Sequence, residues 1–131
     1  MIFVDTGGWF ALTVPIDPDH EKAVNWIAER SDPIITTDYV IDETLTLLRS
    51  RGEQKRAVTL GEDFFERSAA VIYKITDGDL RAAWQIFREY KDKEWSFTDC
   101  TSKVIIENLK ITSVLAFDKH FKQFGSIQNL P

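Results

Sequence analysis

Four acidic residues stand at positions where a folded chain could bring them together. Asp5 ends the apolar run IFVD, and Asp118 ends the run VLAFD. Glu43 and Asp99 lie near the starts of two predicted helices. Carboxylate oxygens bind hard divalent cations such as Mg²⁺ or Mn²⁺, which lower the pKa of bound water and screen charge developing on a phosphodiester. The chemistry that these residues suggest is metal-dependent phosphodiester hydrolysis.

Each of these acids also has a purely structural explanation when it is taken alone. Asp5 would cap the next helix, Asp99 would complete a capping box, and Asp118 would begin an Asx turn. Glu43, at the edge of an apolar helical face, would be an ordinary solvated residue. These separate explanations are weaker if the four acids converge on one edge of the sheet. Two carboxylates 5 Å apart repel by roughly 3 kcal/mol at an effective dielectric constant near 20. A cluster of four acids would therefore be strained unless it were protonated or neutralised by a cation.

The rest of the chain supplies elements that would position these acids. Helix and strand patterns alternate throughout, which predicts an α/β fold with a mostly parallel sheet. We expect strands over residues 2–5, 33–37, 70–75 and 113–117, and a further short strand near 127–130. We expect helices over residues 9–14, 17–30, 38–50, 54–67, 76–90 and 96–110. Because the carboxyl ends of parallel strands share one edge, Asp5 and Asp118 should face the same crevice.

Composition limits the class of protein. The 131 residues are the size of one domain, expected to span 1–131, and 44% hydrophobic with 28% charged residues is typical of globular proteins. No stretch approaches the ~18–20 apolar residues of a membrane span, and no basic region precedes the first apolar run, so we expect a cytoplasmic protein. A single cysteine, Cys100, excludes an internal disulfide. The net charge of −5 argues weakly against nucleic-acid binding unless basic side chains cluster.

Four segments in order resemble the PIN domains, and specifically the VapC-like ribonuclease toxins of toxin–antitoxin pairs. They are IFVDT, TTDYVIDE, SFTDC and VLAFDKHF. The resemblance implies a three-layer α/β/α sandwich around a parallel sheet. It also implies an endoribonuclease that cleaves single-stranded RNA or structured RNA loops. The acids that would form its Mg²⁺ or Mn²⁺ site are Asp5, Glu43, Asp99 and Asp118.

The resemblance also implies partners and supporting residues. We expect an RNA substrate, a homodimer and a small antitoxin that covers the site. Thr6 and Thr98 match the family's polar neighbours of the first and third acids, and would be secondary ligands or support the ligands. Candidate RNA contacts are Arg49, Arg51 and Lys119, through phosphates, and Trp95, by stacking on a base. A solvated surface is the more usual explanation of such basic residues. Lys119 and His120 would lie nearer the metal, although His120 could also pack or face solvent.

Three alternatives remain open. The chain would also fit a PIN nuclease outside toxin–antitoxin systems, or a non-catalytic PIN-type module that binds RNA or protein. A signalling receiver also groups acids at the carboxyl edge of a parallel sheet. A receiver, however, needs adjacent acids after its first strand and a phospho-accepting aspartate at the end of a middle strand. Here the first strand has one acid, and the second ends Thr36-Thr37-Asp38.

Overall fold

The computed structural model describes residues 1–131 and contains one four-stranded sheet in the order β3-β2-β1-β4. The strands are β1 (Ile2–Val4), β2 (Ile34–Thr37), β3 (Val71–Tyr73) and β4 (Ser113–Leu115). The helices are α1 (Thr6–Thr13), α2 (His20–Ala28), α3 (Asp38–Ser50), α4 (Gln54–Phe65), α5 (Asp77–Glu89), α6 (Phe97–Asn108) and the short 3-10 helix η1 (Lys119–Gln123). None of these helices has the length and apolar character needed to cross a bilayer.

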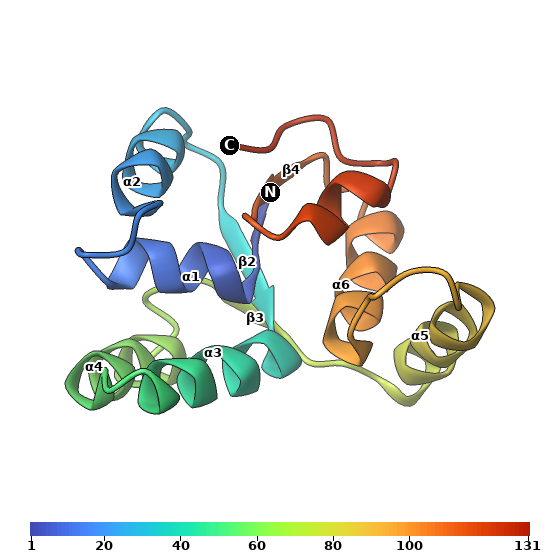
Figure 1. The fold of residues 1–131 in the computed structure, drawn as a ribbon, viewed down its shortest axis with the longest axis horizontal. Helices are drawn as coiled ribbons and strands as arrows, with labels where there is room; N and C mark the ends of the chain where they lie inside the picture. Colours follow the sequence, from blue (N-terminus) through green and yellow to red (C-terminus); the bar gives the residue numbers. More distant parts are fainter.

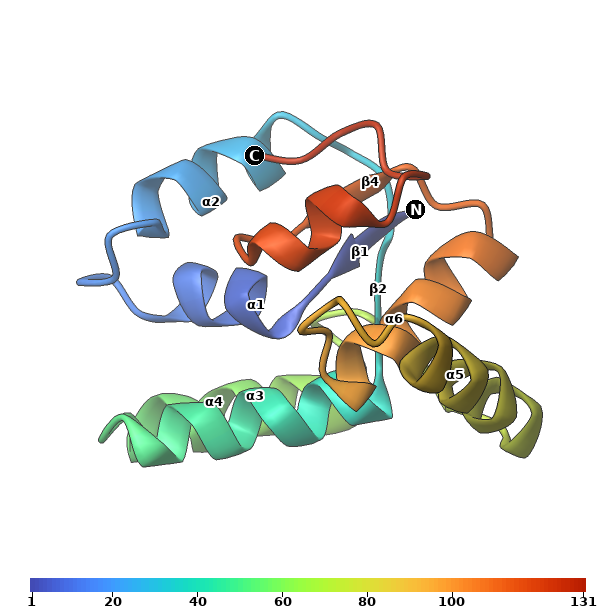
Figure 2. The same ribbon diagram turned by 45° about the vertical axis from the view of Figure 1, so that its right-hand side comes forward.

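Helices cover both faces of the sheet. Figure 1 shows the strands between α1 and α2 on one side and α5 and α6 on the other, and α3 and α4 run side by side in both views (Figures 1 and 2). All three strand pairings are parallel. The predicted α/β/α sandwich with a parallel sheet is therefore confirmed.

The order of the strands creates a crevice beside β1. The chain passes from β1 to β2 and β3 in one direction, and then returns to place β4 on the other side of β1. Ligands of open α/β sheets bind at such a switch point, outside the carboxyl ends of the strands. Asp5 follows β1 directly and Asp118 comes shortly after β4, so both acids border this crevice.

Apolar side chains of the strands and of the inner helix faces form the core. Phe3, Phe64 and Phe121 are among its largest fully buried members. Trp9 is buried as expected: its Nε1 donates to Thr36 Oγ1 at 3.3 Å, and its ring meets Phe64 edge-on at a centroid distance of 4.9 Å. Full burial of one such side chain contributes about 1.5–3 kcal/mol, so these rings anchor α1 and α4 on the sheet.

Helix α1 begins directly after Asp5, although the sequence pattern predicted a start at Trp9. Gly7 and Gly8 therefore lie in the helix and do not form a turn. A Cβ atom at Gly8 would lie 2.3 Å from the backbone oxygen of Leu115, so α1 approaches β4 this closely only with glycine there. Tertiary packing outweighs the poor helix propensity of the two glycines.

The helix predicted from Asp17 begins instead at His20. The Asp17 carboxylate accepts a hydrogen bond from the Asp19 N–H at 3.0 Å, which closes a turn. Asp19 takes the N-cap position but makes no side-chain capping hydrogen bond. The local turn therefore competes with the predicted cap and delays the helix.

The C-terminal part differs from the prediction in two places. Strand β4 ends at Leu115, so two residues separate it from Asp118 and the acid does not end the strand itself. The segment predicted as a strand near 127–130 makes only an isolated bridge between Asn129 and Ser113. The chain after β4 therefore adds no further strand to the sheet. Asp118 lies in the short loop between β4 and η1.

Candidate active site

Asp5 lies at the centre of the candidate site, with only 4% of its surface exposed. It occupies the N-cap position of α1, yet its side chain makes no capping hydrogen bond, and its Oδ1 has no hydrogen-bond partner. A buried polar atom without a partner costs about 1–3 kcal/mol, and more when the group is charged. The capping explanation therefore fails for Asp5, and the free oxygen needs another ligand.

The charges of the other three predicted acids all act on the Asp5 carboxyl group. Burial, followed by the charge of Asp99, raises the pKa of Asp5 well above its ordinary value. The charges of Glu43 and Asp118 raise this pKa further, and only the Thr6 backbone N–H opposes the rise. The four predicted acids therefore lie close enough for their charges to act on Asp5, and two of them, Asp99 and Asp118, belong with His120 to a tighter group of ligand atoms.

Asp99 serves both the helix and the cluster. As N3 residue of α6 it completes a capping box, in which its N–H donates to Ser96 Oγ and its Oδ2 accepts from the Ser96 N–H, each at 3.0 Å. Its Oδ2 also lies 2.9 Å from His120 Nδ1, and its Oδ1 makes no hydrogen bond. Lys103, one turn further along α6, pairs with Glu107 and not with Asp99. The structural explanation for Asp99 is correct and is compatible with a second role.

Helix α3 presents Glu43. Its start is fixed by Thr37, the last residue of β2, whose Oγ1 accepts from the Val40 N–H at 3.1 Å. Glu43 is half-buried at the edge of the apolar face, as the helical pattern predicted, whereas Asp42 is exposed. Of these two neighbouring acids, Glu43 is therefore the one that lies toward the core.

Asp118 reaches the cluster from the C-terminal segment, together with His120. One ligand atom each from Asp99, Asp118 and His120 lie within 4.8 Å of one another. The His120 side chain is 15% exposed, and its Nδ1 lies 3.2 Å from Asp118 Oδ1. The sequence left the role of His120 open. The relevant signal was the Asp-x-His spacing at a turn, which brings the ring back onto the preceding acid.

The two threonines lie beside the acids as expected from the sequence. Thr6 is buried, and its Oγ1 has no hydrogen-bond partner. Thr98 is half-buried at the start of α6, and its carbonyl accepts from Thr101 Oγ1 at 2.7 Å. The free Oγ1 of Thr6 and Oδ1 of Asp5 together fit an oxygen-seeking divalent ion, which would also offset the repulsion among the acids.

The prediction that Trp95 stacks on RNA is wrong for this structure. Its ring is only 6% exposed and packs against Tyr90 and Phe124 at centroid distances of 5.0 and 5.2 Å. Its Nε1 donates to Gln123 Oε1 at 2.7 Å. The loop before α6 folds against η1, a contact between distant segments that the local sequence does not reveal.

The three basic candidates are all exposed, but they differ in their contacts. Arg49 Nε donates to Gln54 Oε1 at 2.7 Å, whereas the side chains of Arg51 and Lys119 make no hydrogen bond or ion pair. Arg51 lines a hollow of about 180 Å³, whose other lining residues are Gly7, Phe10, Asp17, Asp19, Leu47 and Phe117. None of the four predicted acids lines this hollow, but Gly7 and Phe117 lie within two residues of Asp5 and Asp118 in the chain.

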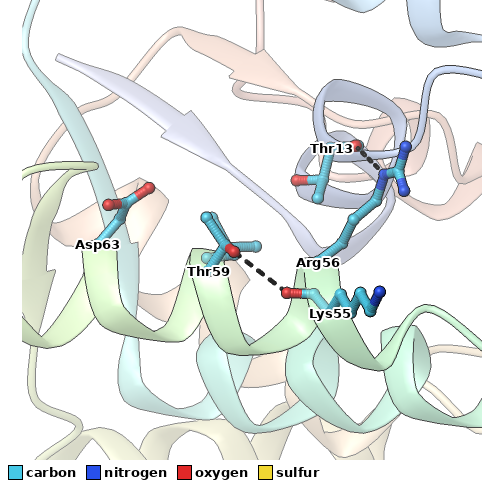
Figure 3. Close-up of a pocket in the computed structure, with 6 residues that line it drawn as sticks. Thr13, Lys55, Arg56, Thr59 and Asp63 are labelled. Carbon is cyan, nitrogen blue, oxygen red and sulfur yellow. Dashed lines mark hydrogen bonds between the residues drawn. The ribbon is translucent and has the colours of Figure 1, made fainter.

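A larger hollow, of about 290 Å³, lies between the end of α1 and helix α4. Figure 3 shows side chains that line it, including Thr13, Lys55, Arg56, Thr59 and Asp63. Arg56 Nε donates to the backbone oxygen of Thr13 at 3.2 Å. None of the predicted acids lines this hollow, and we assign it no part in the chemistry.

Cys100 follows Asp99 but is not a candidate nucleophile. It is fully buried, and burial, followed by the nearby Asp99 charge, raises the pKa of its thiol to about 11. A thiol with such a pKa is almost entirely protonated at neutral pH, and the thiolate is the reactive form. Cys100 is therefore a packed core residue of α6.

Curated relatives match nearly the whole chain. The chain is 32% identical to the 23S rRNA-specific endonuclease VapC20 of Mycobacterium tuberculosis over 132 residues, which cover 100% of this chain and 99% of that protein. It is 28% identical to a VapC ribonuclease of Archaeoglobus fulgidus, over 90% of this chain and 77% of that protein.

Solved structures agree with this relationship. The crystal structure of Mycobacterium tuberculosis VapC20, described as a Sarcin-Ricin loop cleaving toxin, superposes with a TM-score of 0.89 at 29% identity and covers 95% of both chains. FitAcB from Neisseria gonorrhoeae, at 17% identity, has a TM-score of 0.70 over 100% of this chain and 97% of its own, which shows likeness of fold alone. The PIN domain family matches residues 2–127. The resemblance seen in the sequence is thus confirmed, and the chain belongs to the PIN domain family.

Proposed function

We propose that this PIN-domain protein is an Mg²⁺- or Mn²⁺-dependent endoribonuclease and the toxin of a toxin–antitoxin pair. The observation that carries the proposal is Asp5, a buried carboxylate with an unpartnered oxygen, set among three further acids. The nature of the substrate is supported by two relatives, which are named a 23S rRNA-specific endonuclease and a VapC ribonuclease.

Each acid has a proposed task. Asp5, Asp99 and Asp118 hold the ion, and Glu43 is a further ligand or orients the attacking water. The divalent ion, when bound, activates water and screens the negative charge of the phosphodiester. Asp5 is held rigidly by β1 and α1, and Asp99 by its capping box, which favours a fixed geometry. Thr6 and Thr98 act as secondary ligands or support the carboxylates.

The RNA path follows α3 away from the acids. Glu43 and Leu47 lie on one face of α3, and Arg51, the C-cap residue of this helix, follows after a further four residues, about 12 Å from Glu43 along the axis. The unpaired Arg51 guanidinium in the hollow that it lines is suited to a backbone phosphate beside the cleaved one. Arg49 and Lys119 are weaker candidates for the same task.

We also infer a homodimer, an antitoxin partner and a cytoplasmic location, with residues 1–131 forming one catalytic domain. The support for self-association is a row of exposed aromatic rings on α5, which includes Trp84 and Phe87. Large exposed apolar patches on soluble proteins commonly mark interaction sites. The support for an antitoxin is the description of the structural relative VapC20 as a toxin.

The chain contains a matched control for testing the acid site. Asp79 and Asp99 are both buried N3 residues of capping boxes, completed by Thr76 and Ser96 respectively. Only Asp99 belongs to the acid cluster. Asp79→Asn and Asp99→Asn should each destabilise one helix by about 0.5–2 kcal/mol. Only Asp99→Asn should abolish cleavage, by more than the 10–100-fold loss typical of groups that merely support a metal ligand.

The experiment compares cleavage of a ribosomal RNA fragment by the wild type and by both variants, with Mg²⁺ or Mn²⁺ and with EDTA. Thermal unfolding of each variant controls for folding. Cleavage by Asp99→Asn at the rate of Asp79→Asn, or cleavage that persists in EDTA, contradicts the metal-nuclease proposal. Absence of divalent binding by the wild type would instead favour a non-catalytic binding module.

A further inference from the structure

His120 joins two of the proposed metal-binding acids, which come from different parts of the chain. Its Nδ1 lies 2.9 Å from Asp99 Oδ2, at the start of α6, and 3.2 Å from Asp118 Oδ1, just before η1. The His120 backbone N–H donates to the same Asp118 oxygen at 3.0 Å. The imidazole ring is therefore a direct link between α6 and the C-terminal segment within the acid cluster.

The chemistry of the partners determines which atom donates. An ionised carboxylate only accepts hydrogen bonds, so when Asp99 and Asp118 are both ionised the hydrogen lies on His120 Nδ1. This holds for the neutral ring with Nδ1–H and for the charged ring alike. His120 Nε2 makes no hydrogen bond within the protein. The side-chain hydrogen bond of His120 runs from Nδ1 to Asp99 Oδ2, while Asp118 Oδ1 accepts from the His120 backbone N–H and lies 3.2 Å from the same Nδ1.

These contacts leave one oxygen of each acid available. The Oδ2 of Asp99 and the Oδ1 of Asp118 are engaged with His120, whereas Asp99 Oδ1 and Asp118 Oδ2 make no hydrogen bond. Asp118 depends most on this contact, because its side chain is 47% exposed and it follows the end of β4 in a loop. A free, exposed side chain loses rotamer entropy when it is immobilised on a ligand, which weakens binding.

We propose that His120 is a positioning residue, whose ring donates from Nδ1 to Asp99 and lies against Asp118, and so fixes the two carboxylates relative to each other and presents their free oxygens to the divalent ion. The inference rests on the proposed function of the same acids. Loss of groups that orient metal ligands typically weakens metal affinity about 10–100-fold. A loss of this size is therefore expected when the Nδ1 donor is removed.

Two substitutions of similar polarity distinguish the role of the Nδ1 donor from the role of the rest of the imidazole ring. The amide nitrogen of His120→Asn lies near the position of Nδ1, whereas that of His120→Gln reaches toward the position of Nε2. Mn²⁺ binding, measured by titration calorimetry and by the electron paramagnetic resonance signal of free Mn²⁺, should be near the wild-type level for His120→Asn. It should weaken about 10-fold or more for His120→Gln and His120→Ala.

His20→Asn is the matched control. The Nδ1 of His20 contacts the backbone oxygen of Ala11 at 2.7 Å and has no contact with the acids, so Mn²⁺ binding should not change. Saturating Mn²⁺ should restore RNA cleavage to His120→Ala, because a positioning defect lowers affinity and leaves the bound site competent. Thermal unfolding in EDTA verifies folding, and if His120→Ala does not fold, the comparison of His120→Asn with His120→Gln still decides the question.

The outcomes distinguish this inference from the function on which it rests. A wild type that binds no Mn²⁺ at millimolar concentration contradicts the proposed function itself. Normal Mn²⁺ binding by the wild type and by all His120 variants leaves the metal site intact and overturns the positioning role. Binding by His120→Asn that is as weak as that of His120→Ala, or cleavage that saturating Mn²⁺ does not restore, also overturns it.

Discussion

At the scale of single residues, Asp5 is placed where its own charge is unfavourable. Burial, followed by the charge of Asp99, raises its pKa in the folded protein above the ordinary value of 3.8. Both states are protonated below the unfolded-state pKa, so Asp5 then has no effect on stability. As the pH rises above the unfolded-state pKa, Asp5 ionises more readily in the unfolded chain than in the folded protein. The free energy of unfolding of the metal-free protein therefore falls until the pH passes the folded-state pKa.

Replacement of Asp5 should therefore stabilise the metal-free protein. The amide of asparagine does not ionise, so Asp5→Asn should raise the melting temperature at pH 7 by about 3–5 °C for each kcal/mol of penalty removed. The gain should shrink as the pH falls toward about 4, where the unfolded carboxyl becomes protonated. Calorimetry in EDTA across this pH range measures the difference. A variant less stable than the wild type at pH 7 contradicts the account of Asp5 as a strained acid.

At the scale of secondary-structure elements, the close approach of α1 to β4 brings Asp5 and Asp118 to one crevice. Gly8→Ala should push the two elements apart, because the new Cβ would lie 2.3 Å from the Leu115 backbone oxygen. We expect a loss of about 1–3 kcal/mol of stability, typical of overpacking. Gly7→Ala is the control, since its nearest contact would be 3.9 Å from the Phe117 nitrogen. Equal melting temperatures for the two variants would refute this explanation.

Helix α3 carries the proposed RNA contact. Arg51→Ala should weaken RNA binding and reduce the slope of log affinity against log salt concentration by about 0.7–1, as expected for one lost phosphate contact. Arg56→Ala, in the separate hollow of Figure 3, should leave this slope unchanged. Fluorescence anisotropy with labelled RNA in EDTA measures binding without cleavage. An identical slope for the wild type and Arg51→Ala would remove Arg51 from the RNA path.

At the scale of the whole molecule, exposed aromatic side chains gather on α5, which lies on the outer side of α6 (Figure 2). Trp84 is 51% exposed, and its ring stacks on Phe87 at a centroid distance of 6.0 Å. Phe87 in turn meets Phe97 of α6 at 5.9 Å. The exposure of Trp84 leaves contact with a second copy of the chain as its proposed role.

Trp84→Glu should therefore convert the proposed homodimer into a monomer without unfolding it. A half-exposed ring contributes little to the core, whereas a buried charge at an interface is strongly unfavourable. Light scattering after size-exclusion chromatography gives the mass of each species. Phe65→Glu, at an exposed position on α4, is the control. A dimer that survives Trp84→Glu and dissociates with Phe65→Glu places the interface on α4, and a monomeric wild type makes the homodimer prediction wrong.

Much of the site was predictable from local patterns. The apolar run before Asp5, the helical spacing around Glu43 and the capping box of Asp99 depend on residues close in sequence, and the structure contains all three. The gathering of the acids followed from the parallel sheet, because its strands share one carboxyl edge. The metal-binding and catalytic roles of these acids stay predictions until they are measured.

The sequence by itself determined which acids are candidates for the site, the order and type of the main secondary-structure elements, and the family to which the chain belongs. These properties depend on residue identity, short spacings and hydrophobic period. Only the tertiary structure decided that β1 lies between β2 and β4, that Trp95 is buried and that His120 lies against Asp99. Each of these depends on contacts between segments far apart in the chain. Such contacts result from the packing of the whole core, and no local pattern specifies them.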